Sequence, residues 1–341
     1  MNKRTTPNKP TIYDVARRAG VSIATISKVI NHKGSISDRK RKEVWQAIEE
    51  LDFQPNVMAS ALTGKPTRTV GLLVPDIANA FFAELVRHIE NRCRELGYNV
   101  YVCSTDYDPV IEERSIAVLR RQRVDGIVCI SGFENADGVR RLASEPFPVA
   151  VVARDFDELD IDVVAADDVM GGYLAGSHLL ELGHRDIAVL ARNVRSNRDR
   201  VRGFRMALER NGVASREPID FVDAGSIESG KARALGDLSG RSPPTAIFAC
   251  NEMLAIGAIE AVEERGMSVP EDISVVSYDG SLLATIARPA LTTIAQPTMQ
   301  IGERAVDWLD LRIRGERSAG AKLLLPPRLV VRNSTGMAPR R

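Results

Sequence analysis

Apolar positions recur every three or four residues in three short segments near the start of the chain, residues 12–19, 23–31 and 38–51. Their apolar residues are Ile12, Val15, Ala16, Ala19, Ile26, Val29, Ile30, Val44, Trp45, Ile48 and Leu51. This spacing places side chains on one face of a helix. The pattern therefore predicts three amphipathic helices that share a small core.

Polar residues and a glycine mark the ends of these helices. Thr11 followed by Asp14 has the spacing of a capping box, and Gly20 can end the first helix in the left-handed conformation. Ser22 and Ser37 are placed to cap the second and third helices. The turn between the first two helices is then only a few residues long, which is the spacing of a helix-turn-helix.

The second helix presents a set of small and polar side chains away from the predicted core. The residues on this outward side, or at the exposed N-terminal end, are Ile23, Ala24, Thr25, Ser27, Lys28 and Asn31. In a helix-turn-helix the second helix lies in the major groove, where outward side chains meet base edges and phosphates. The segment therefore predicts a DNA-reading head.

A short polar segment follows the third helix. Gln54 and Pro55 break that helix, and Asn56 can cap one or two further turns over residues 57–62 before Thr-Gly-Lys-Pro at residues 63–66 ends regular structure. A helix this short is not stable alone in water. We expect it to become ordered only on DNA.

From Arg68 onward, short apolar runs alternate with stretches of helical spacing. The runs are residues 69–75, 98–104, 125–131 and 148–154 in a first series, and residues 186–191, 219–224, 245–250 and 272–278 in a second. Continuous apolar strands that alternate with helices predict parallel sheets covered on both faces. Two series predict two α/β lobes of this kind, so the fold class is an all-α head followed by a two-lobed α/β core.

The pattern also indicates where the chain passes between the lobes. Helical residues 169–182 are expected to cross to the second lobe and residues 291–297 to cross back, before a helix at 301–313 and final strands at 323–332. The predicted domains are a disordered lead-in (1–10), the helix-turn-helix head (11–55), a hinge helix and linker (56–67), an effector-binding and dimerisation domain (68–335) and a tail (336–341). Within the effector-binding domain, the first lobe is expected at about 68–166 and 297–324, and the second at about 167–296 and 325–335.

The distribution of charge agrees with a DNA-binding head. Residues 1–65 carry 12 Lys and Arg against 6 Asp and Glu, a net charge of +6, while the remainder has a net charge of −5. The overall charge of +1 therefore conceals a basic head on a mildly acidic body. Cations of this kind bind the phosphate backbone, because neutralised phosphates release counterions.

Other features argue against an enzyme, a metal protein or a membrane protein. The four cysteines lack metal-ligand spacing and are expected to be core thiols in a reducing cytoplasm. The four histidines are dispersed, no nucleophile or phosphate-binding motif occurs, and Asp167 and Asp168 need only solvent or capping roles. No long apolar run or secretion signal is present. We expect a cytoplasmic protein without cofactor or metal.

Ligands of open α/β sheets bind beyond the carboxyl ends of the strands, which in a two-lobed protein is the cleft between the lobes. The candidates at these strand ends are Asp76, Asn79, Phe81, Phe82, Arg154, Ser196, Arg200, Asn251 and Asp279. Such a set suits a sugar, because carboxylate, amide and guanidinium groups pair with hydroxyls and an aromatic ring stacks on the apolar sugar face.

Some of these residues have simpler interpretations. Phe81 or Phe82 can belong to the core of the following helix, and we expect one to face inward and one to face the cleft. Arg154 can have no role in ligand binding and simply pair with Asp155 or Asp157. Asn251 can cap the helix predicted at residues 252–264, or do this and bind the ligand as well.

Residues 11–62 resemble, almost position by position, the DNA-binding head and hinge of the LacI/GalR family of bacterial transcriptional regulators. The rest of the chain resembles the periplasmic-binding-protein-like core of that family. This second resemblance is carried by the segments VGLLVPDIANAFFAEL, RVDGIVCISG, LGHRDIAVL, GFRMAL, ACNEMLAIGAIEAVEERGMSVPEDISVVSYDG and PALTTIAQP. Together the matches cover about residues 11–335.

The resemblance implies roles for residues of the head. Ile23, Ala24 and Lys28 would specify bases, with Lys28 facing a guanine and Ala24 either facing a thymine methyl group or allowing a close approach to the DNA. Leu62 would be the hinge leucine that wedges into the minor groove and kinks the operator. The expected DNA-binding residues are Thr11, Ser22, Ile23, Ala24, Thr25, Ser27, Lys28, Asn31, Ser37, Arg39, Asn56, Ala59 and Leu62.

The resemblance also bears on the ligand. Arg200 and Asp279 match the ligand-binding arginine and aspartate of the family. Ala153, Glu252 and Gly280, however, each stand where family members commonly have Asp. These departures change the polar groups of the pocket, so a sugar acid or a modified sugar becomes a candidate.

The sequence therefore predicts a homodimeric repressor that binds a pseudo-palindromic operator and whose DNA affinity is set by a small effector, a sugar or sugar derivative. An activator, or a regulator that needs a co-repressor such as a purine, shares every feature described and stays open. A solute-binding receptor would share the body but would have no use for the head.

Overall fold

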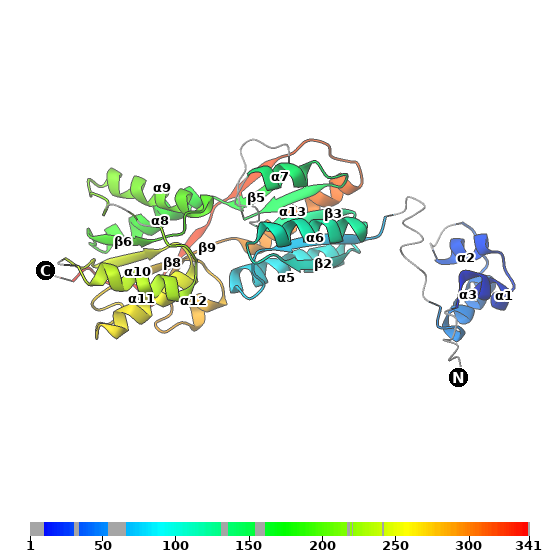
Figure 1. Ribbon diagram of the computed structural model, residues 1–341, viewed down its shortest axis with the longest axis horizontal. Coiled ribbons are helices and arrows are strands. Elements are labelled where there is room, and N and C mark those ends of the chain that lie inside the picture. Colours follow the sequence, from blue (N-terminus) through cyan, green and yellow to red (C-terminus); the bar gives the residue numbers. More distant parts are fainter. Residues whose placement is uncertain are drawn as a thin grey trace, which may run out of the picture. The chain divides into compact units, whose positions relative to one another are not determined.

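The computed structural model describes residues 10–30, 34–53, 66–130, 136–153, 161–216, 219, 221–240 and 242–339. The chain forms two compact units, the head (Met1–Thr67) and the body (Arg68–Arg341). Both are drawn in Figure 1. Each is considered separately below.

The head contains three helices, α1 (Ile12–Ala19), α2 (Ile23–Ile30) and α3 (Asp38–Glu50). The predicted capping box is present at α1, since the backbone N and Oγ1 of Thr11 donate to Oδ2 of Asp14 at 2.9 and 2.7 Å. Gly20 ends α1 with φ 63°, a left-handed conformation that costs glycine little. Ser22 accepts a hydrogen bond from the backbone N of Thr25. The helix-turn-helix spacing is therefore set by local hydrogen bonds.

The core of the head differs from the prediction at one residue. Helical spacing predicts a buried Trp45, but 41% of its surface is exposed. Val44 and Ile48, four residues apart, point inward, and Ala47 fills the position beside them. Trp45 lies about 100° around the helix from Val44, outside the sector that Val44, Ala47 and Ile48 share. Ser37 precedes α3 but its side chain makes no capping hydrogen bond.

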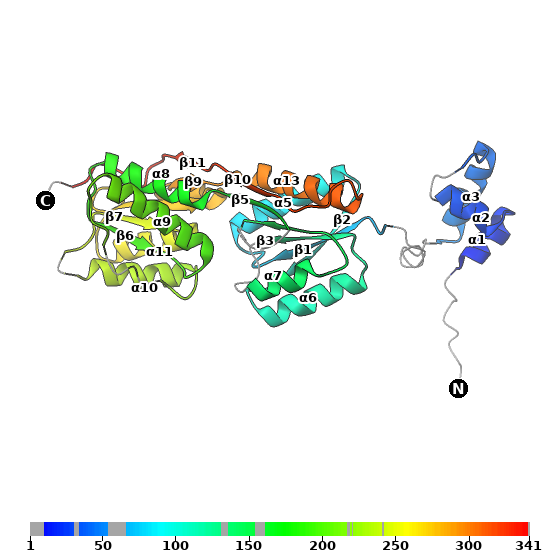
Figure 2. The same cartoon turned by 90° about the horizontal axis from the view of Figure 1, so that it is seen from above.

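The body contains two sheets, each forming the centre of one lobe. The first sheet has the strand order β10-β5-β4-β3-β1-β2 and is parallel throughout. Its strands are β1 (Thr69–Val74), β2 (Asn99–Ser104), β3 (Gly126–Ile130), β4 (Val149–Val152), β5 (Asp162–Ala166) and β10 (Lys322–Leu325). Helices α5 (Ala80–Glu95) and α13 (Thr298–Ile313) cover one face, and α6 (Pro109–Arg121) and α7 (Ala136–Ala143) cover the other (Figure 2).

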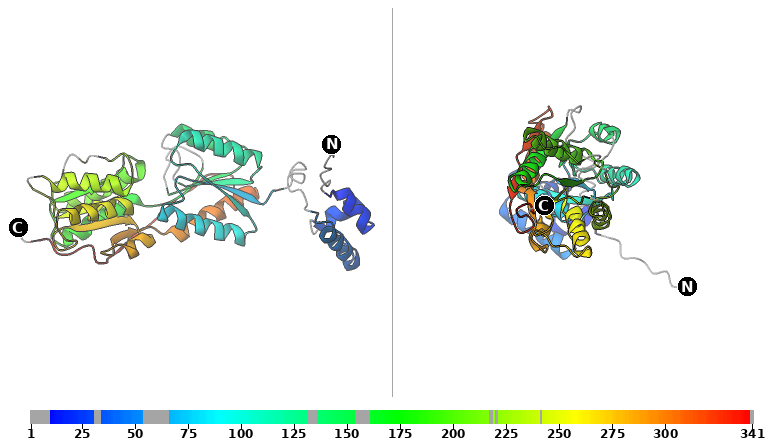
Figure 3. Two further views of the ribbon diagram at one scale, coloured as in Figure 1. Left: turned by 60° about the horizontal axis from the view of Figure 1, so that its bottom comes forward. Right: turned by 90° about the vertical axis from the view of Figure 1, so that its left-hand side faces the viewer.

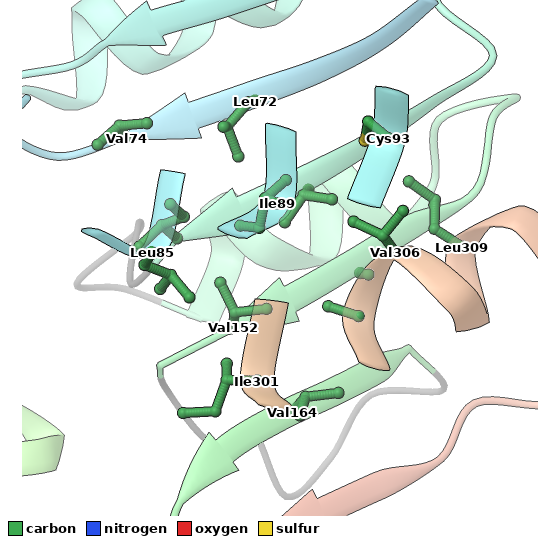
Figure 4. Packing of buried hydrophobic residues seen from close by; sticks show 14 of the residues in the cluster. Leu72, Val74, Leu85, Ile89, Cys93, Val152, Val164, Ile301, Val306 and Leu309 are labelled. Atoms are coloured by element: carbon green, nitrogen blue, oxygen red, sulfur yellow. The ribbon is translucent and has the colours of Figure 1, made fainter. Parts of the chain in front are cut away.

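Apolar side chains are buried between α5, α13 and the first sheet, and this burial explains why the chain returns to the first lobe. Ile301, Val306 and Leu309 of α13 pack with Leu85 and Ile89 of α5 against the strands (Figure 4). Each fully buried aliphatic side chain contributes about 1.5–3 kcal/mol. The late helix is therefore an integral part of the first lobe.

The second sheet has the order β11-β9-β8-β7-β6 and is parallel except for its edge strand β11, which runs antiparallel to β9. Its strands are β6 (Ile187–Leu190), β7 (Ala246–Ala249), β8 (Ser274–Asp279), β9 (Thr292–Ala295) and β11 (Arg328–Val330). Helices α8 (Asp168–Glu181) and α9 (Arg195–Arg210) cover one face, α10 (Ile227–Leu238) and α11 (Glu252–Glu264) cover the other, and α12 (Leu282–Ile286) is a short helix after β8.

The passages between the lobes lie close to the predicted positions but differ in detail. The chain passes from one sheet to the other before α8, after β9 and between β10 and β11 (Figures 1 and 3). Residues 292–295 form a strand of the second sheet, so the return passage comes after them. The apolar runs do not predict β5, and the predicted strand at 219–224 is an isolated bridge from Val222 to Arg192 in the described residues.

A glycine contact holds α8 and α9 together. A Cβ on Gly172 would lie 1.8 Å from the carbonyl oxygen of Arg200, and one on Gly203 would lie 1.8 Å from that of Val169. Any side chain here would force the helices apart. This contact fixes the part of α9 that carries Arg200, whose role is described below.

We predict that Gly172→Ala lowers the free energy of unfolding by at least about 2 kcal/mol, because the added methyl group overlaps backbone that cannot move cheaply. Gly236→Ala is the matched control. Gly236 is exposed on α10 with no atom within 4 Å of an added Cβ, so the same change should raise stability by up to about 1 kcal/mol. Urea denaturation measures both, and equal stability of the two variants would contradict the packing described.

Candidate functional site

A cleft between the two lobes encloses about 690 Å³, including space open to solvent. This size suits a small organic ligand. The residues that line it are Asn79, Phe81, Phe82, Tyr107 and Ala153 from the first lobe and Arg192, Val194, Arg195, Ser196, Asn197, Arg200, Asn251 and Asp279 from the second. Most of them follow the carboxyl ends of strands or begin the helices after those strands, while Asp279 ends β8 and Arg200 lies in the second turn of α9.

Arg200 is the most deeply held cation of the cleft, with 6% of its surface exposed. Its Nε donates to Oδ1 of Asp168 at 2.8 Å, and its Nη1 donates to the carbonyl of Cys250 at 2.5 Å and to Oδ1 of Asp279 at 3.5 Å. The guanidinium also lies 3.7 Å from the ring centre of Tyr278. The sequence places these groups on α8, α9 and β8, which meet at one end of the second sheet.

Burial and ion pairing compete in this cluster. Burial disfavours the charged form of Arg200, but the carboxylates of Asp168 and Asp279 outweigh it and raise the pKa of the guanidinium. Burial also raises the pKa of Asp168 and of Asp279, an effect that Arg200 offsets. A buried charge is stable only when it is paired and hydrogen-bonded. Arg200 therefore fixes the positions of both carboxylates.

Asp279 ends β8 in a strained conformation with φ 102°. Two hydrogen bonds hold it there: Nε2 of Gln296 donates to its Oδ1 at 2.8 Å, and the backbone N of Gln296 donates to its carbonyl at 3.0 Å. A non-glycine residue in this region costs about 1–3 kcal/mol, and such residues gather at ligand sites. The strain thus aims a carboxylate at the cleft.

Glu252 lies behind Asp279 and is almost fully buried. Its two carboxylate oxygens accept hydrogen bonds from the backbone N of Ser281, at 2.7 Å, and from the Ser281 hydroxyl. Burial, followed by the nearby charge of Asp279, raises the pKa of Glu252 to about 8. The carboxyl is therefore protonated near neutral pH.

The outer part of the cleft is basic and aromatic. The guanidinium of Arg192 lies 4.8 Å from the ring centre of Tyr107, which belongs to the other lobe. The backbone N of Arg192 donates to Oδ1 of Asn197 at 2.9 Å. Nε of Arg195 lies 3.9 Å from Oδ2 of Asp199. The contact between Arg192 and Tyr107 joins the two lobes at the cleft, and the other two hold arginines of the second lobe beside it.

Most of the predicted effector residues come together. The candidates that line the cleft are Asn79, Phe81, Phe82, Ser196, Arg200, Asn251 and Asp279. Asp76 is not among the lining residues; its Oδ1 accepts a hydrogen bond from the backbone N of Ala78 in the loop after β1. Arg154 lies outside the described residues.

The side chains of Phe81, Phe82 and Asn251 all line the cleft, but only Asn251 lies as predicted. Phe81 and Phe82 are predicted to point in opposite directions, but both are buried and both line the cleft, with ring centres 5.3 Å apart. Both residues lie in the first turn of α5, and each contacts the core of the first lobe as well as the cleft. Asn251 both caps α11, by accepting from the backbone N of Leu254, and lines the cleft.

Several lining residues are absent from the sequence prediction. Tyr107 follows β2, and Arg192, Val194, Arg195 and Asn197 follow β6. Ligands bind beyond the carboxyl ends of parallel strands, and this principle, applied to β2 and β6, would have predicted these residues as well. Asp168, expected only in contact with solvent or as a cap, instead pairs with Arg200. No sequence signal distinguishes it from Asp167, whose side chain caps α8.

The head presents the predicted recognition surface on α2. Ile23, Ala24 and Lys28 are exposed, whereas Ile26 and Val29 are buried in the core. Thr25 and Ser27 are half-buried, and the exposed Thr11, Ser22, Ser37 and Arg39 lie at or near the starts of the helices. Asn31, Asn56, Ala59 and Leu62 lie outside the described residues. No acidic residue lies in the first turn of α2.

Among the residues that the structure describes, no cluster of His, Cys, Asp and Glu could hold a metal ion, and no helix is long and apolar enough to cross a membrane. Cys93, Cys129 and Cys250 are buried as expected, while Cys103 is only half-buried. His184 is buried between Thr245 and Ser274, at 2.9 and 3.0 Å, and therefore has a structural role.

The state of Glu252 gives a prediction for stability. Its pKa is about 8 in the folded protein against an ordinary value of 4.5, so the folded state holds the proton more tightly. Its contribution to stability is complete below about pH 4.5 and is lost as pH rises through 8. The free energy of unfolding should therefore fall across this window, at most by about 1.4 kcal/mol per pH unit.

Glu252→Gln should flatten this fall, because glutamine stays neutral at every pH. Glu263→Gln is the control, since Glu263 is exposed on the same helix and its replacement should leave the profile as in the parent protein. Urea denaturation from pH 5 to 8.5 measures the effect. A profile unchanged in Glu252→Gln would refute a protonated Glu252.

Comparison with known proteins supports this description of head and body. Residues 11–56 match the model of "Bacterial regulatory proteins, lacI family", and residues 177–335 match "Periplasmic binding protein-like domain". The chain is 46% identical over 332 residues to the HTH-type transcriptional regulator DegA of Bacillus subtilis (strain 168), covering 96% of this chain and 98% of that protein. It is 32% identical to the ribose operon repressor of Haemophilus influenzae, over 95% and 98% of the two chains.

A solved structure shows the same architecture over the full length. The lac repressor dimer bound to operator and the anti-inducer ONPF aligns with a TM-score of 0.86 and 31% identity, covering 96% of this chain and all of that one. The alignments with these two proteins cover nearly the whole length of this chain and of each of them. The chain therefore belongs to the lacI family of bacterial regulatory proteins, and it is a DNA-binding transcriptional repressor and not an enzyme.

Proposed function

We propose that the protein is a cytoplasmic homodimer that binds a pseudo-palindromic operator and whose DNA affinity is set by a sugar or sugar derivative in the cleft. The main support is that one chain combines a helix-turn-helix with exposed Ile23, Ala24 and Lys28 and a two-lobed body with a polar cleft. Two heads related by a twofold axis read a palindrome, because each meets the same half-site.

In this proposal, α2 lies in the major groove. Lys28 donates to the acceptor edge of a guanine, and Ala24 is small enough to contact a thymine methyl group. The net charge of +6 on residues 1–65 supplies the attraction to phosphates that does not depend on sequence. The roles of Asn56, Ala59 and Leu62 in the hinge stay predictions.

The cleft offers groups that match adjacent hydroxyls. Asp279 supplies a carboxylate, Asn251 an amide and Arg200 a guanidinium, and Phe81 and Phe82 supply an apolar wall. The ribose operon repressor among the relatives is consistent with a sugar. An effector changes DNA affinity only if it binds one arrangement of the lobes more tightly than another. Because Tyr107 and Arg192 meet across the cleft, an occupant can alter that arrangement.

Exposed apolar side chains in both lobes support the homodimer. Tyr101 and Val102 lie on β2, the edge strand of the first sheet, and Ile77 follows β1. Leu282 and Ile286 on α12 are also exposed, Leu282 at 67%. Exposed edge strands and apolar patches of this kind mark protein interfaces. The lac repressor of similar structure is described as a dimer.

Lys28→Ala should relax the base preference at one position of each half-site and weaken specific binding by about 1–3 kcal/mol. Selection from a library of random DNA duplexes measures the preference at every base of the site. Lys42→Ala removes the same charge from the exposed face of α3 and should leave every base preference intact. Preferences unchanged at every base in Lys28→Ala would remove this residue from base recognition.

Leu282→Glu should weaken the dimer by at least about tenfold, since it places a charge in a desolvated contact. Sedimentation equilibrium over a range of concentrations measures the change. Met206→Glu is the control, because Met206 is also exposed but lies on α9. If both variants keep the dimer of the parent chain, the interface lies elsewhere.

A further inference from the structure

Two side chains from different lobes meet at the cleft. Tyr107 follows β2 in the first lobe, Arg192 follows β6 in the second, and both line the cleft. The guanidinium carbon of Arg192 lies over the ring of Tyr107, 4.8 Å from its centre. A guanidinium within about 6 Å of an aromatic ring is attracted by the electrons on the face of the ring. The contact therefore holds together two strand ends of different lobes.

Tyr107 lies in a tight turn that does not suit a tyrosine. The backbone N of Asp108 donates to the carbonyl of Thr105 at 2.8 Å, which closes the turn. The two central residues, Asp106 and Tyr107, have φ 52° and 59°. A four-residue turn with two positive φ values is of type I′, in which Gly, Asn and Asp dominate the central positions. Asp106 fits this preference, whereas the bulky side chain of Tyr107 is strained there.

Hydrogen bonds on both sides hold this turn in place. The backbone N of the buried Thr105 donates to the carbonyl of Val74 at 2.9 Å. Oδ1 of Asp108 accepts from the backbone N of Val110 at 2.7 Å and so caps α6. Strained residues persist only where the surrounding structure fixes them, and they gather at ligand clamps and switches. The strain at Tyr107 thus indicates a role for its ring at the cleft, beyond closing the turn.

Arg192 is held equally firmly on the second lobe. Its Nε donates to the carbonyl of Asp223 at 3.3 Å, and its backbone N donates to Oδ1 of Asn197 at 2.9 Å. A Cβ on Gly225 would lie 3.1 Å from Cδ of Arg192, so the stem of the arginine packs on this glycine. The guanidinium that covers Tyr107 therefore projects from a fixed position.

We propose that Tyr107 and Arg192 form a latch that holds the lobes in the arrangement described here and so limits access to the cleft. Opening of the lobes separates the ends of β2 and β6 and breaks the contact. Loss of either side chain therefore shifts the balance of arrangements toward the open one, by as much as the contact contributes. The latch is a property of the body alone, whereas its effect on DNA affinity rests on the proposed function of the cleft as the effector site.

The first test measures access to the cleft in the full-length protein and needs no ligand. Ser196→Cys places a thiol in the cleft lining, and its rate of alkylation by iodoacetamide follows the open fraction. Peptide mass spectrometry separates this thiol from Cys103, which is half-buried on β2 and serves as the reference. In this background, Tyr107→Leu or Arg192→Met should raise the rate about two- to fivefold, the factor that corresponds to an exposed cation–π contact.

Two kinds of variant separate the latch from other effects of the same substitutions. Tyr107→Phe keeps the ring and Arg192→Lys keeps a positive charge, so both should react more nearly as the Ser196→Cys parent does. Val110→Ala is the control for truncation near the turn, because Val110 is exposed on α6 and does not line the cleft. The thiols of the buried cysteines should stay unreactive in every variant, which shows that each is folded.

The double variant Tyr107→Leu/Arg192→Met decides between a latch and two side chains that merely fill space at the cleft. If the two residues act through one contact, either single substitution already removes it, and the double variant should react no faster than the faster single variant. If the two increases multiply, each side chain acts alone and the proposal is overturned. Unchanged rates in both single variants overturn it as well.

Operator binding distinguishes failure of the latch from failure of the proposed function. The probe is the DNA duplex that the parent protein selects from a random library. Neither latch residue lies in the head, so Tyr107→Leu and Arg192→Met should change operator affinity in the same direction and by a similar factor. If both variants open the cleft but bind operator as the parent does, the latch stands and control of DNA binding by the lobes fails. If neither variant opens the cleft, the latch itself is wrong.

Discussion

The buried pairing of Arg200 with Asp168 and Asp279 is the constraint on which the site depends. A guanidinium that is 6% exposed needs carboxylates in fixed positions. Asp168 begins α8 directly after the first passage between the lobes, and Asp279 is bonded to Gln296 at the second. The backbone N of Asp167 donates to the carbonyl of Leu325 at the third. The pairing thus links the cleft to the first two connections between the lobes, and the residue before Asp168 is bonded to the third.

In the proposed function, this arrangement lets a ligand in the cleft act on the connections between the lobes. A ligand that contacts Arg200 or Asp279 acts on groups bonded to the connections, and it contacts Tyr107 and Arg192 on opposite lobes at the same time. Differential affinity for two arrangements of the lobes is then sufficient for control. The glycine contact between α8 and α9 keeps Arg200 in place, so that ligand energy is not lost in local rearrangement.

Much of this could be predicted from sequence because its causes are local. Capping residues, helical spacing and the alternation of strands and helices predict the head, the two lobes and most of the cleft. The prediction for Trp45 is wrong because the partner helices decide which sector of α3 faces the core, and this sector contains Val44, Ala47 and Ile48. The pairing of Asp168 escapes prediction because it depends on a contact 32 residues away in sequence. Tyr107 and Arg192 meet only when the fold brings two strand ends together.

The proposed function requires that this chain reads a specific palindromic DNA sequence. Capture and sequencing of genomic fragments from the source organism, with purified protein at moderate salt, tests it most directly. If the chain reads such a sequence, a small number of fragments share a roughly palindromic motif, and the neighbouring genes indicate the ligand pathway. Diffuse, salt-sensitive binding without a shared motif, in the absence and in the presence of added metabolites, would contradict it.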